Sequence, residues 1–193
     1  MSTQDCSSNY NRLELRSEAQ KEWSRKPERM EPNTVSLDDI DRAILRELQV
    51  DGRVSNLDLA RRIGLSAPAT HARVRRLERD GVIRGYVGLL DREQVGYDLL
   101  CLISVSIQLH QYEHVERFRA LVREMPEVLE CHHLTGEYDY VLKVALHNRR
   151  DLERFVVERL TPIPGVQRIH TSLVLSEVKS TTALPIPYVP AIP

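Results

Sequence analysis

The feature that most constrains this chain is the concentration of arginine between Arg53 and Arg84. That window holds eight arginines against three acidic residues, so its net charge is +5, although the whole chain carries only −1. The rest of the sequence therefore sums to −6. Such an asymmetry predicts a basic module joined to an acidic one.

Composition limits the class of protein. The chain has 193 residues, 41% of them hydrophobic but only 5% aromatic, so a packed core is feasible and must rest on Leu, Ile and Val. Cys6, Cys101 and Cys131 are odd in number and far apart, which is not a disulfide framework and favours a reduced protein. No apolar run approaches the roughly 18 residues of a membrane span, and the polar N-terminus does not resemble a signal peptide. We expect a cytoplasmic protein without a membrane partner.

Residues 36–84 form the basic block, and their pattern predicts three helices and a hairpin. Ser36, Ser55 and Ser66 each stand where a helix N-cap is expected. The third helix has a proline in its first turn, where the missing N–H costs nothing. The hairpin is expected after Gly81 as the wing of a helix-turn-helix motif.

The third expected helix separates its residues into two faces at about 100° per residue. Ala67, Thr70, Val74 and Leu77 fall on one narrow arc, which we expect to be buried. The opposite arc has small residues near its start and arginines towards its end, so it can enter a DNA major groove and reach base edges and phosphates. A merely solvated basic face is the alternative. The predicted DNA-contacting residues are Ser55, Asn56, Ser66, Ala69, His71, Ala72, Arg75, Arg76, Arg79 and Arg84.

Residues 98–180 alternate strand-like and helical segments in the order βαββαβ. This order is typical of a ferredoxin-like fold, so the chain as a whole is predicted to be an α+β protein. A sheet with one uncovered face and free edges favours pairing with a second copy of the chain. The flanking segments, 1–35 and 181–193, are expected to be a flexible polar arm and an extended proline-rich tail.

The two blocks together resemble the Lrp/AsnC family of transcriptional regulators. The resemblance extends from about Leu37 to Ile186 and is carried by "LDDIDRAILRELQVDGRVSNLDLARRIGLS", "RVRRLERDGVIRGY", "TGEYDY" and "IPGVQRIHTSLVLSEVKSTTALPI". It implies a winged helix-turn-helix over 36–84, a strand-bearing linker over 85–97 and an ACT-like, ligand-binding RAM domain over 98–180. It also implies a homodimer that assembles to an octamer, and a small effector, usually an amino acid, bound between subunits. The expected function is sequence-specific DNA binding that responds to this effector.

The loop "LTGEYDY" is the predicted effector site. Its hydroxyl, bare glycine backbone and two carboxylates could hold the ammonium and carboxylate of an amino acid, but an ordinary turn with acidic edges fits the residues as well. The resemblance favours the effector loop, because Thr135, Gly136, Tyr138 and Asp139 match the family's pattern. Glu137 lies between them and is included in the predicted site.

The last expected strand adds two residues to that site. The resemblance implies that Thr171 lines the pocket, and Ile169 shares its face because side chains alternate along a strand. An apolar Ile169 favours an apolar effector such as leucine.

Other patterns predict no chemistry. Cys131 and His133 share one face of their strand whereas His132 points to the other, so we expect no metal site, and no cofactor or catalytic motif is recognisable. Two alternatives to a regulator remain. One is an enzyme on the same scaffold, because sirohaem decarboxylases resemble this family, although such an enzyme would not need a basic recognition helix. The other is a general DNA-compacting protein that binds without an effector.

Overall fold

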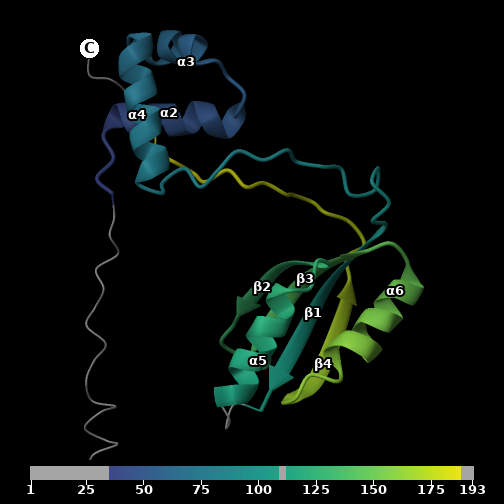
Figure 1. Ribbon diagram of the computed structural model, residues 1–193. Helices are drawn as coiled ribbons and strands as arrows, with labels where there is room; N and C mark the ends of the chain where they lie inside the picture. Colours follow the sequence, from purple (N-terminus) through teal and green to yellow (C-terminus); the bar gives the residue numbers. More distant parts are fainter. Residues whose placement is uncertain (1–34, 109–111, 188–193) are drawn as a thin grey trace, which may run out of the picture. The chain divides into compact units, whose positions relative to one another are not determined.

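The computed structural model describes residues 35–108 and 112–187, and these fall into two compact units (Figure 1). The first unit contains residues 35–86 together with 183–187, and the second contains residues 87–182. The arm expected over 1–35 lies outside the described residues except for Val35, as do the last residues of the tail. The described part of the tail, from residue 183 onward, belongs to the first unit.

Three helices build the first unit: α2 (Asp39–Val50), α3 (Asn56–Ile63) and α4 (Ala67–Arg79). Ser55 and Ser66 cap α3 and α4 as predicted, and each hydroxyl accepts a backbone N–H from the first turn. The prediction for α2 was wrong at its start, because Asp38 rather than Ser36 is the N-cap. Asp38 and Asp41 form a complete capping box, in which each side chain accepts from the other residue's backbone N–H.

A small apolar core joins these helices. Ile44, Leu45, Leu59 and Leu77 are its buried members, and the residues that follow α4 pack against it through Val82 and Ile83. Beyond that contact, residues 81–98 form turns and extended segments without a strand, so neither a paired wing nor the strand predicted in the linker is present in the single chain.

The second unit has the predicted order of strands and helices. The elements are β1 (Leu99–Ile107), α5 (Tyr112–Arg123), β2 (Val128–His133), β3 (Tyr140–Leu146), α6 (Arg149–Arg154) with its π-helical continuation η1 (Phe155–Leu160), and β4 (Val166–Leu173). The strands pair antiparallel in the order β2-β3-β1-β4. This is the βαββαβ arrangement of a ferredoxin-like fold, and it confirms the predicted α+β class.

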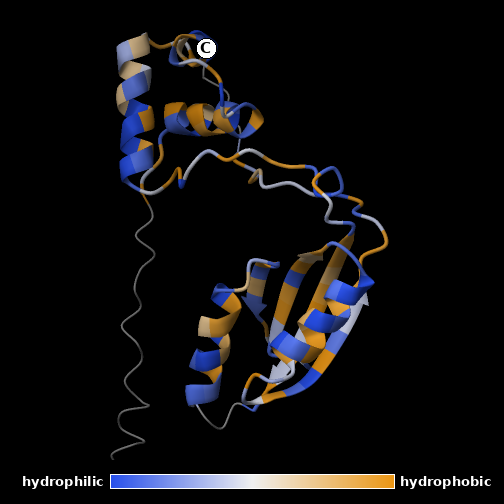
Figure 2. Ribbon diagram, turned by 45° about the vertical axis from the view of Figure 1, so that its right-hand side comes forward, coloured by the Kyte–Doolittle hydropathy of each residue, from blue (hydrophilic) through white to orange (hydrophobic). Residues whose placement is uncertain are grey.

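The core of the second unit lies between the helices and one face of the sheet. Ile103 on β1 and Leu142 on β3 are neighbours in register and fully buried, and they pack in one cluster with Phe118 of α5 and Phe155 of η1. Figure 2 shows the hydrophobic residues of the strands beneath the two helices. The other face of the sheet carries no described helix, and Leu102 on it is 42% exposed.

Candidate DNA interface and ligand loop

Helix α4 presents an outward face that is small at its start and basic at its end. Ala69, His71 and Ala72 are exposed, and the side chains of Arg75 and Arg79 are 69% and 73% exposed. Figure 2 shows the same change in character along α4, from pale residues at its start to blue residues at its end. The ion pairs of Arg75 and Arg79 are long, at 3.5 Å to Glu78 and 3.6 Å to Asp80, and both acids are neighbours on the same segment. Exposed pairs of this kind are weak, so both guanidinium groups can exchange them for phosphates or guanine edges.

Arg76 does not share that outward face, in contrast to the sequence prediction. Its guanidinium forms an ion pair with Asp41, whose side chain is 1% exposed, and Arg73 donates to the other oxygen of Asp41 over 2.9 Å. Arg73 also binds Asp38 over 2.6 Å. The long arginine side chain bends towards the helix interface because the buried carboxylate there is stabilised by a charged partner on each of its oxygens. Arg76 therefore fastens α4 to α2.

The charge of Asp38 is maintained by this cluster. Burial works to raise the pKa of Asp38, but the hydrogen bonds from the backbone of Asp41 and from Arg73 outweigh it, and the pKa lies below its usual value. The sequence analysis missed the cluster of Asp38, Asp41, Arg73 and Arg76, because its members lie on α4 and at the start of α2 and Arg76 was assigned to the DNA-contacting face.

Three further residues predicted to contact DNA have bonds that fix the starts of α3 and α4. The Ser55 hydroxyl donates to Asp58 over 2.6 Å, and this bond is the main cause that lowers the pKa of Asp58. Asn56 donates from Nδ2 to the carbonyl of Ala67 over 2.8 Å, which joins the start of α3 to the start of α4. Ser66 caps α4 by accepting from Ala69 N–H. Arg84, by contrast, is exposed beyond the end of α4.

The predicted effector loop joins β2 to β3, and its polar groups are bonded within the chain. Asp139 Oδ2 accepts the backbone N–H of Ile107 over 2.7 Å, and the backbone N–H of Asp139 donates to Val105 O over 3.1 Å. Asp139 thereby extends the β1–β3 ladder past the last regular pair. Leu134 N–H closes the loop by donating to the carbonyl of Asp139 over 2.8 Å.

The rest of the loop lies beside strand β4. Glu137 forms an ion pair with Arg168 over 3.2 Å, and both side chains are more than 60% exposed. Tyr138 lies beside His170 with ring centroids 6.1 Å apart, and Arg168 lies over the Tyr138 ring at 5.4 Å. Thr135 and Gly136 are exposed at the tip, where Gly136 has φ +132° and nothing lies within 4 Å of the Cβ that another residue would add. Such a φ favours glycine, and the open backbone leaves the tip accessible.

The two β4 residues of the predicted site lie on the other face of the sheet. Ile169 pairs in register with Val105, and Thr171 pairs with Ile103, so both side chains point towards the helices. Ile169 packs against the core. The residues of β4 that do contact the loop are Arg168 and His170, which alternate with Ile169 and Thr171. The alternation was visible in the sequence, but the loop's position above the opposite face was not.

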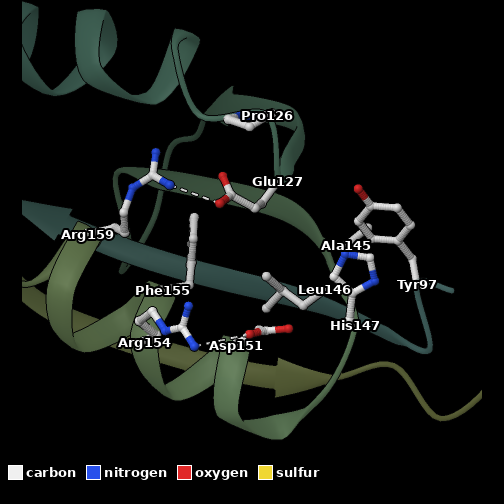
Figure 3. A pocket seen from close by; sticks show the side chains of 10 residues that line it. All are labelled: Tyr97, Pro126, Glu127, Ala145, Leu146, His147, Asp151, Arg154, Phe155 and Arg159. Carbon is white, nitrogen blue, oxygen red and sulfur yellow. Dashed lines mark hydrogen bonds and ion pairs between the residues drawn. The ribbon is translucent and has the colours of Figure 1, made fainter.

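A cavity of about 320 Å³ opens at the other end of β3 (Figure 3). Phe155 and Leu146 form an apolar part of its wall, and the rings of Tyr97 and His147 stack at one end with centroids 4.2 Å apart. On the side that Figure 3 shows above Phe155, Arg159 binds Glu127 over 2.9 Å. None of the predicted effector residues lines this cavity, whose members come from segments that the sequence did not single out.

The described residues contain neither a cluster of metal-binding side chains nor a helix that could span a membrane. Within residues 35–108 and 112–187, no group of three or more His, Cys, Asp or Glu side chains is placed to hold a metal ion. In the same part of the chain, no helix is long and apolar enough to cross a membrane.

Family models match both units. A winged helix-turn-helix DNA-binding model matches residues 37–84, and the model of the Lrp/AsnC ligand-binding domain matches residues 100–184. The second match begins within β1 and ends at Leu184, inside the tail segment that packs on the first unit.

Relatives and solved structures agree with these matches. The chain is 40% identical over 148 residues to the leucine-responsive regulatory protein of Salmonella typhimurium, which covers 77% of this chain and 90% of that protein. A transcriptional regulator of Neisseria meningitidis, solved as a complex with L-methionine, is 41% identical with a TM-score of 0.75 over 78% of this chain and 97% of the other. A feast or famine regulatory protein of Mycobacterium tuberculosis, also complexed with L-methionine, is 34% identical with a TM-score of 0.69 over 79% of this chain and 100% of the other.

The exposed basic face of α4 and the ligand-domain sheet thus belong to a known pair of modules. The relatives that align with this chain over nine-tenths of their own length are named as regulatory proteins. None of these matches points to the enzyme alternative. The chain belongs to the Lrp/AsnC family of DNA-binding transcriptional regulators.

Proposed function

We propose that this regulator reads DNA through α4 and changes its DNA binding when an amino acid occupies the 134–139 loop. The observation that carries the proposal is the outward face of α4, where exposed Ala69, His71 and Ala72 precede two exposed arginines. Small side chains allow the helix backbone to approach base edges, and the arginines supply charge and donors. Arg84 follows as a phosphate contact, whereas Ser55, Asn56 and Ser66 act by fixing the starts of α3 and α4 and can add contacts through their exposed atoms.

The DNA surface is tested by Arg75→Ala and Arg79→Ala. A base-reading arginine contributes about 1–3 kcal/mol of discrimination, and its loss relaxes one operator position, whereas a lost phosphate contact weakens all duplexes alike. Titrations of an operator and of a random duplex at one stated salt concentration distinguish the two cases. Arg117→Ala removes an exposed arginine from α5 in the other unit and serves as the control. Full operator affinity in the Arg75/Arg79 double variant would refute the assignment.

The same titrations test the DNA-compacting alternative. A regulator binds its operator much more tightly than random duplex, typically by a factor of about 10³ or more. A compacting protein binds both alike. Equal affinities in the wild type would therefore favour compaction.

The proposed ligand is an amino acid with an apolar side chain. Two solved relatives are complexes with L-methionine, and the relatives from Salmonella typhimurium and Klebsiella pneumoniae are named leucine-responsive. In this chain, the hydroxyl and backbone N–H groups of the exposed tip at Thr135 and Gly136 can donate to the carboxylate of an amino acid. The Glu137 carboxylate has an exposed ion pair with Arg168, which it can exchange for an ion pair with the ammonium group of the ligand. Asp139 contributes by ordering the loop through Ile107, and Tyr138 supplies an aromatic wall beside His170.

Thr135→Ala and Glu137→Gln test this loop. Both variants should bind the operator like the wild type without ligand, because the loop belongs to a different unit from α4. Their response to L-leucine and L-methionine should fall, since coupling between two sites is typically worth about 1–3 kcal/mol. Arg154→Ala, at the rim of the cavity near Phe155, is the matched control. If that control loses the response and the loop variants keep it, the ligand binds in the cavity.

We further propose a homodimer as the smallest unit, with assembly to an octamer, in the bacterial cytoplasm where its DNA is located. The uncovered face of the sheet, with Leu102 exposed, supports the dimer, and the loop supports an intersubunit ligand site because its own carboxylates already have partners. Ile169 and Thr171 face away from the loop of their own chain, so they take part only if a neighbouring subunit presents its loop to them. Light scattering on the wild type and on Leu102→Asp tests the dimer, and a monomeric wild type would contradict it.

A further inference from the structure

The chain crosses between its two units twice. The first crossing follows Tyr86, at the expected linker, and the second follows Thr182, after which the tail rejoins the DNA-binding unit. The second crossing brings residues 184–187 onto α2, the helix that carries the buried Asp41. The DNA-binding unit is therefore built from both ends of the described chain.

Three side chains define this contact. The side-chain amide of Gln49 donates from Nε2 to the carbonyl of Leu184 over 3.1 Å and accepts the Leu184 N–H at Oε1 over 2.6 Å. One helical turn earlier, Arg46 donates to the carbonyl of Pro187 over 3.0 Å. Ile186, which lies between Leu184 and Pro187 in the sequence, is partly buried against the apolar core of the unit.

This contact has a defined register, but its hydrogen bonds are accessible to solvent. Gln49 pairs with Leu184 through both a donor and an acceptor, as a neighbouring strand would, so the register of the tail is fixed. Pro185 and Pro187 hold the segment extended, which lowers the entropy lost when it docks. The hydrogen bonds are exposed to solvent, and Leu184 is 73% exposed, so the segment can also detach.

The same segment is joined to the strand beside the proposed ligand loop. Strand β4 contacts the loop through Arg168 and Glu137, and its ladder with β1 continues to Val174 N–H, which donates to Leu100 O over 2.9 Å. Residues 175–182 follow without a helix or strand. One short stretch of chain therefore connects β4 to the segment docked on α2, whose Asp41 holds Arg73 and Arg76 of α4.

We propose that residues 183–187 are a strap that couples the ligand domain to the DNA-binding unit. The strap rests on the proposed function, since it transmits a ligand response. When it is docked, the strap completes the first unit and holds α2. Because the strap is connected to β4, its docking responds to ligand binding at the 134–139 loop. The length of residues 175–182, which join β4 to the strap, is then a functional quantity.

The experiment lengthens the connection between β4 and the strap and leaves the strap itself intact. Gly-Ser-Gly-Ser inserted after Ser180 keeps Leu184 and Ile186 available to α2 but slackens the connection. Operator affinity without ligand should stay within about twofold of wild type. The shift in operator affinity caused by saturating L-leucine or L-methionine should fall at least severalfold, within the about 5–150-fold range typical of such coupling. The same four residues appended after Pro193 are the control and should leave the shift unchanged.

A second variant tests docking itself, with no ligand present. Gln49→Ala removes both bonds to Leu184 and should increase hydrogen exchange at the Leu184 amide, whereas Gln108→Ala, an exposed glutamine in the other unit, should not. Unchanged exchange in Gln49→Ala would show that the tail does not dock as a strap. If the wild type responds to either amino acid and the insertion variant responds equally, the strap is refuted and the proposed function stands. If the wild type responds to neither, the proposed ligand response fails, and the coupling role of the strap fails with it.

Discussion

The outward face of α4 and the 134–139 loop are both polar surfaces predicted to bind a partner, yet they differ in what the chain has already done with their charges. On α4, Arg75 and Arg79 have only long, exposed ion pairs to neighbouring acids. In the loop, Asp139 is bonded to the backbone of β1, and Glu137 is paired with β4. The charges of the proposed DNA surface are therefore exposed in a single chain, whereas the carboxylates of the proposed ligand loop are already used to order that loop.

A second contrast lies within α4 itself. Arg75 and Arg76 are adjacent in sequence, but one side chain is largely exposed and the other binds the buried Asp41. A helix turns by about 100° per residue, so neighbouring residues occupy different faces. Net charge on a recognition helix thus overstates the charge available to DNA, because part of it stabilises the fold.

The largest expected effect comes from removing the acid beneath α4. Asp41→Ala leaves Arg76 without its partner and leaves Arg73 with Asp38 alone, and breaking a buried ion pair typically costs about 3–5 kcal/mol. Because both arginines are partly exposed, we expect a loss at the lower end of this range. The free energy of unfolding of the first unit, measured by denaturant titration, should fall by about 3 kcal/mol. Asp39→Ala is the control: its pair with Arg42 is exposed and should contribute less than about 1 kcal/mol. Equal losses in both variants would show that Asp41 has no special role.

The next expected effect separates Arg76 from Arg75. Arg76→Ala should lower the free energy of unfolding by about 1–3 kcal/mol, because Asp41 loses a charged partner. Arg75→Ala should leave stability within about 0.5 kcal/mol, as is usual for an exposed site, and lower operator affinity instead. Thermal unfolding and operator titration on both variants give the comparison. If the two variants exchange these phenotypes, the orientation of α4 described above is wrong.

A smaller effect is expected in the loop. Asp139→Ala deprives the Ile107 N–H of its acceptor, which should lower stability by about 1–2 kcal/mol and loosen the loop. Asp139→Asn keeps an acceptor oxygen at the same place and should retain most of that stability. Hydrogen exchange at the Ile107 amide distinguishes the two variants. Protection that survives in Asp139→Ala would show that the bond does not order the loop.

The smallest expected effect is on the stability of the protein at acidic pH. The folded-state pKa of Asp38 lies below its usual value, so its ionised form favours the folded state. This contribution is fully present above the unfolded pKa of about 3.9 and is lost as the pH falls through the folded pKa. Asp38→Asn should therefore flatten the dependence of unfolding free energy on pH below about pH 4, and leave the dependence near neutrality unchanged. An identical acid profile in both proteins would contradict the role of Asp38.

Local patterns in the sequence predicted most of the architecture. Ser55 and Ser66 were placed correctly as caps, and the order of elements in the second unit was confirmed. These features depend on residues within a few positions of one another, where propensity and capping act. The start of α2 was misplaced by two residues because Ser36 and Asp38 are both good caps, and only the bond from Asp41 distinguishes them.

Sequence by itself determined which modules this protein has, because helix faces, strand alternation and the spacing of caps are local properties of the chain. Tertiary structure alone decided which charges remain available. It turned Arg76 towards Asp41, bonded Asp139 to Ile107, and placed Ile169 on the face opposite Arg168 and the loop. It also placed Leu184 against Gln49, although the whole ligand domain lies between these two residues in the sequence. The physical reason is the same in each case: a buried or closely packed polar group takes the partner that folding brings near, and that partner lies far away along the chain.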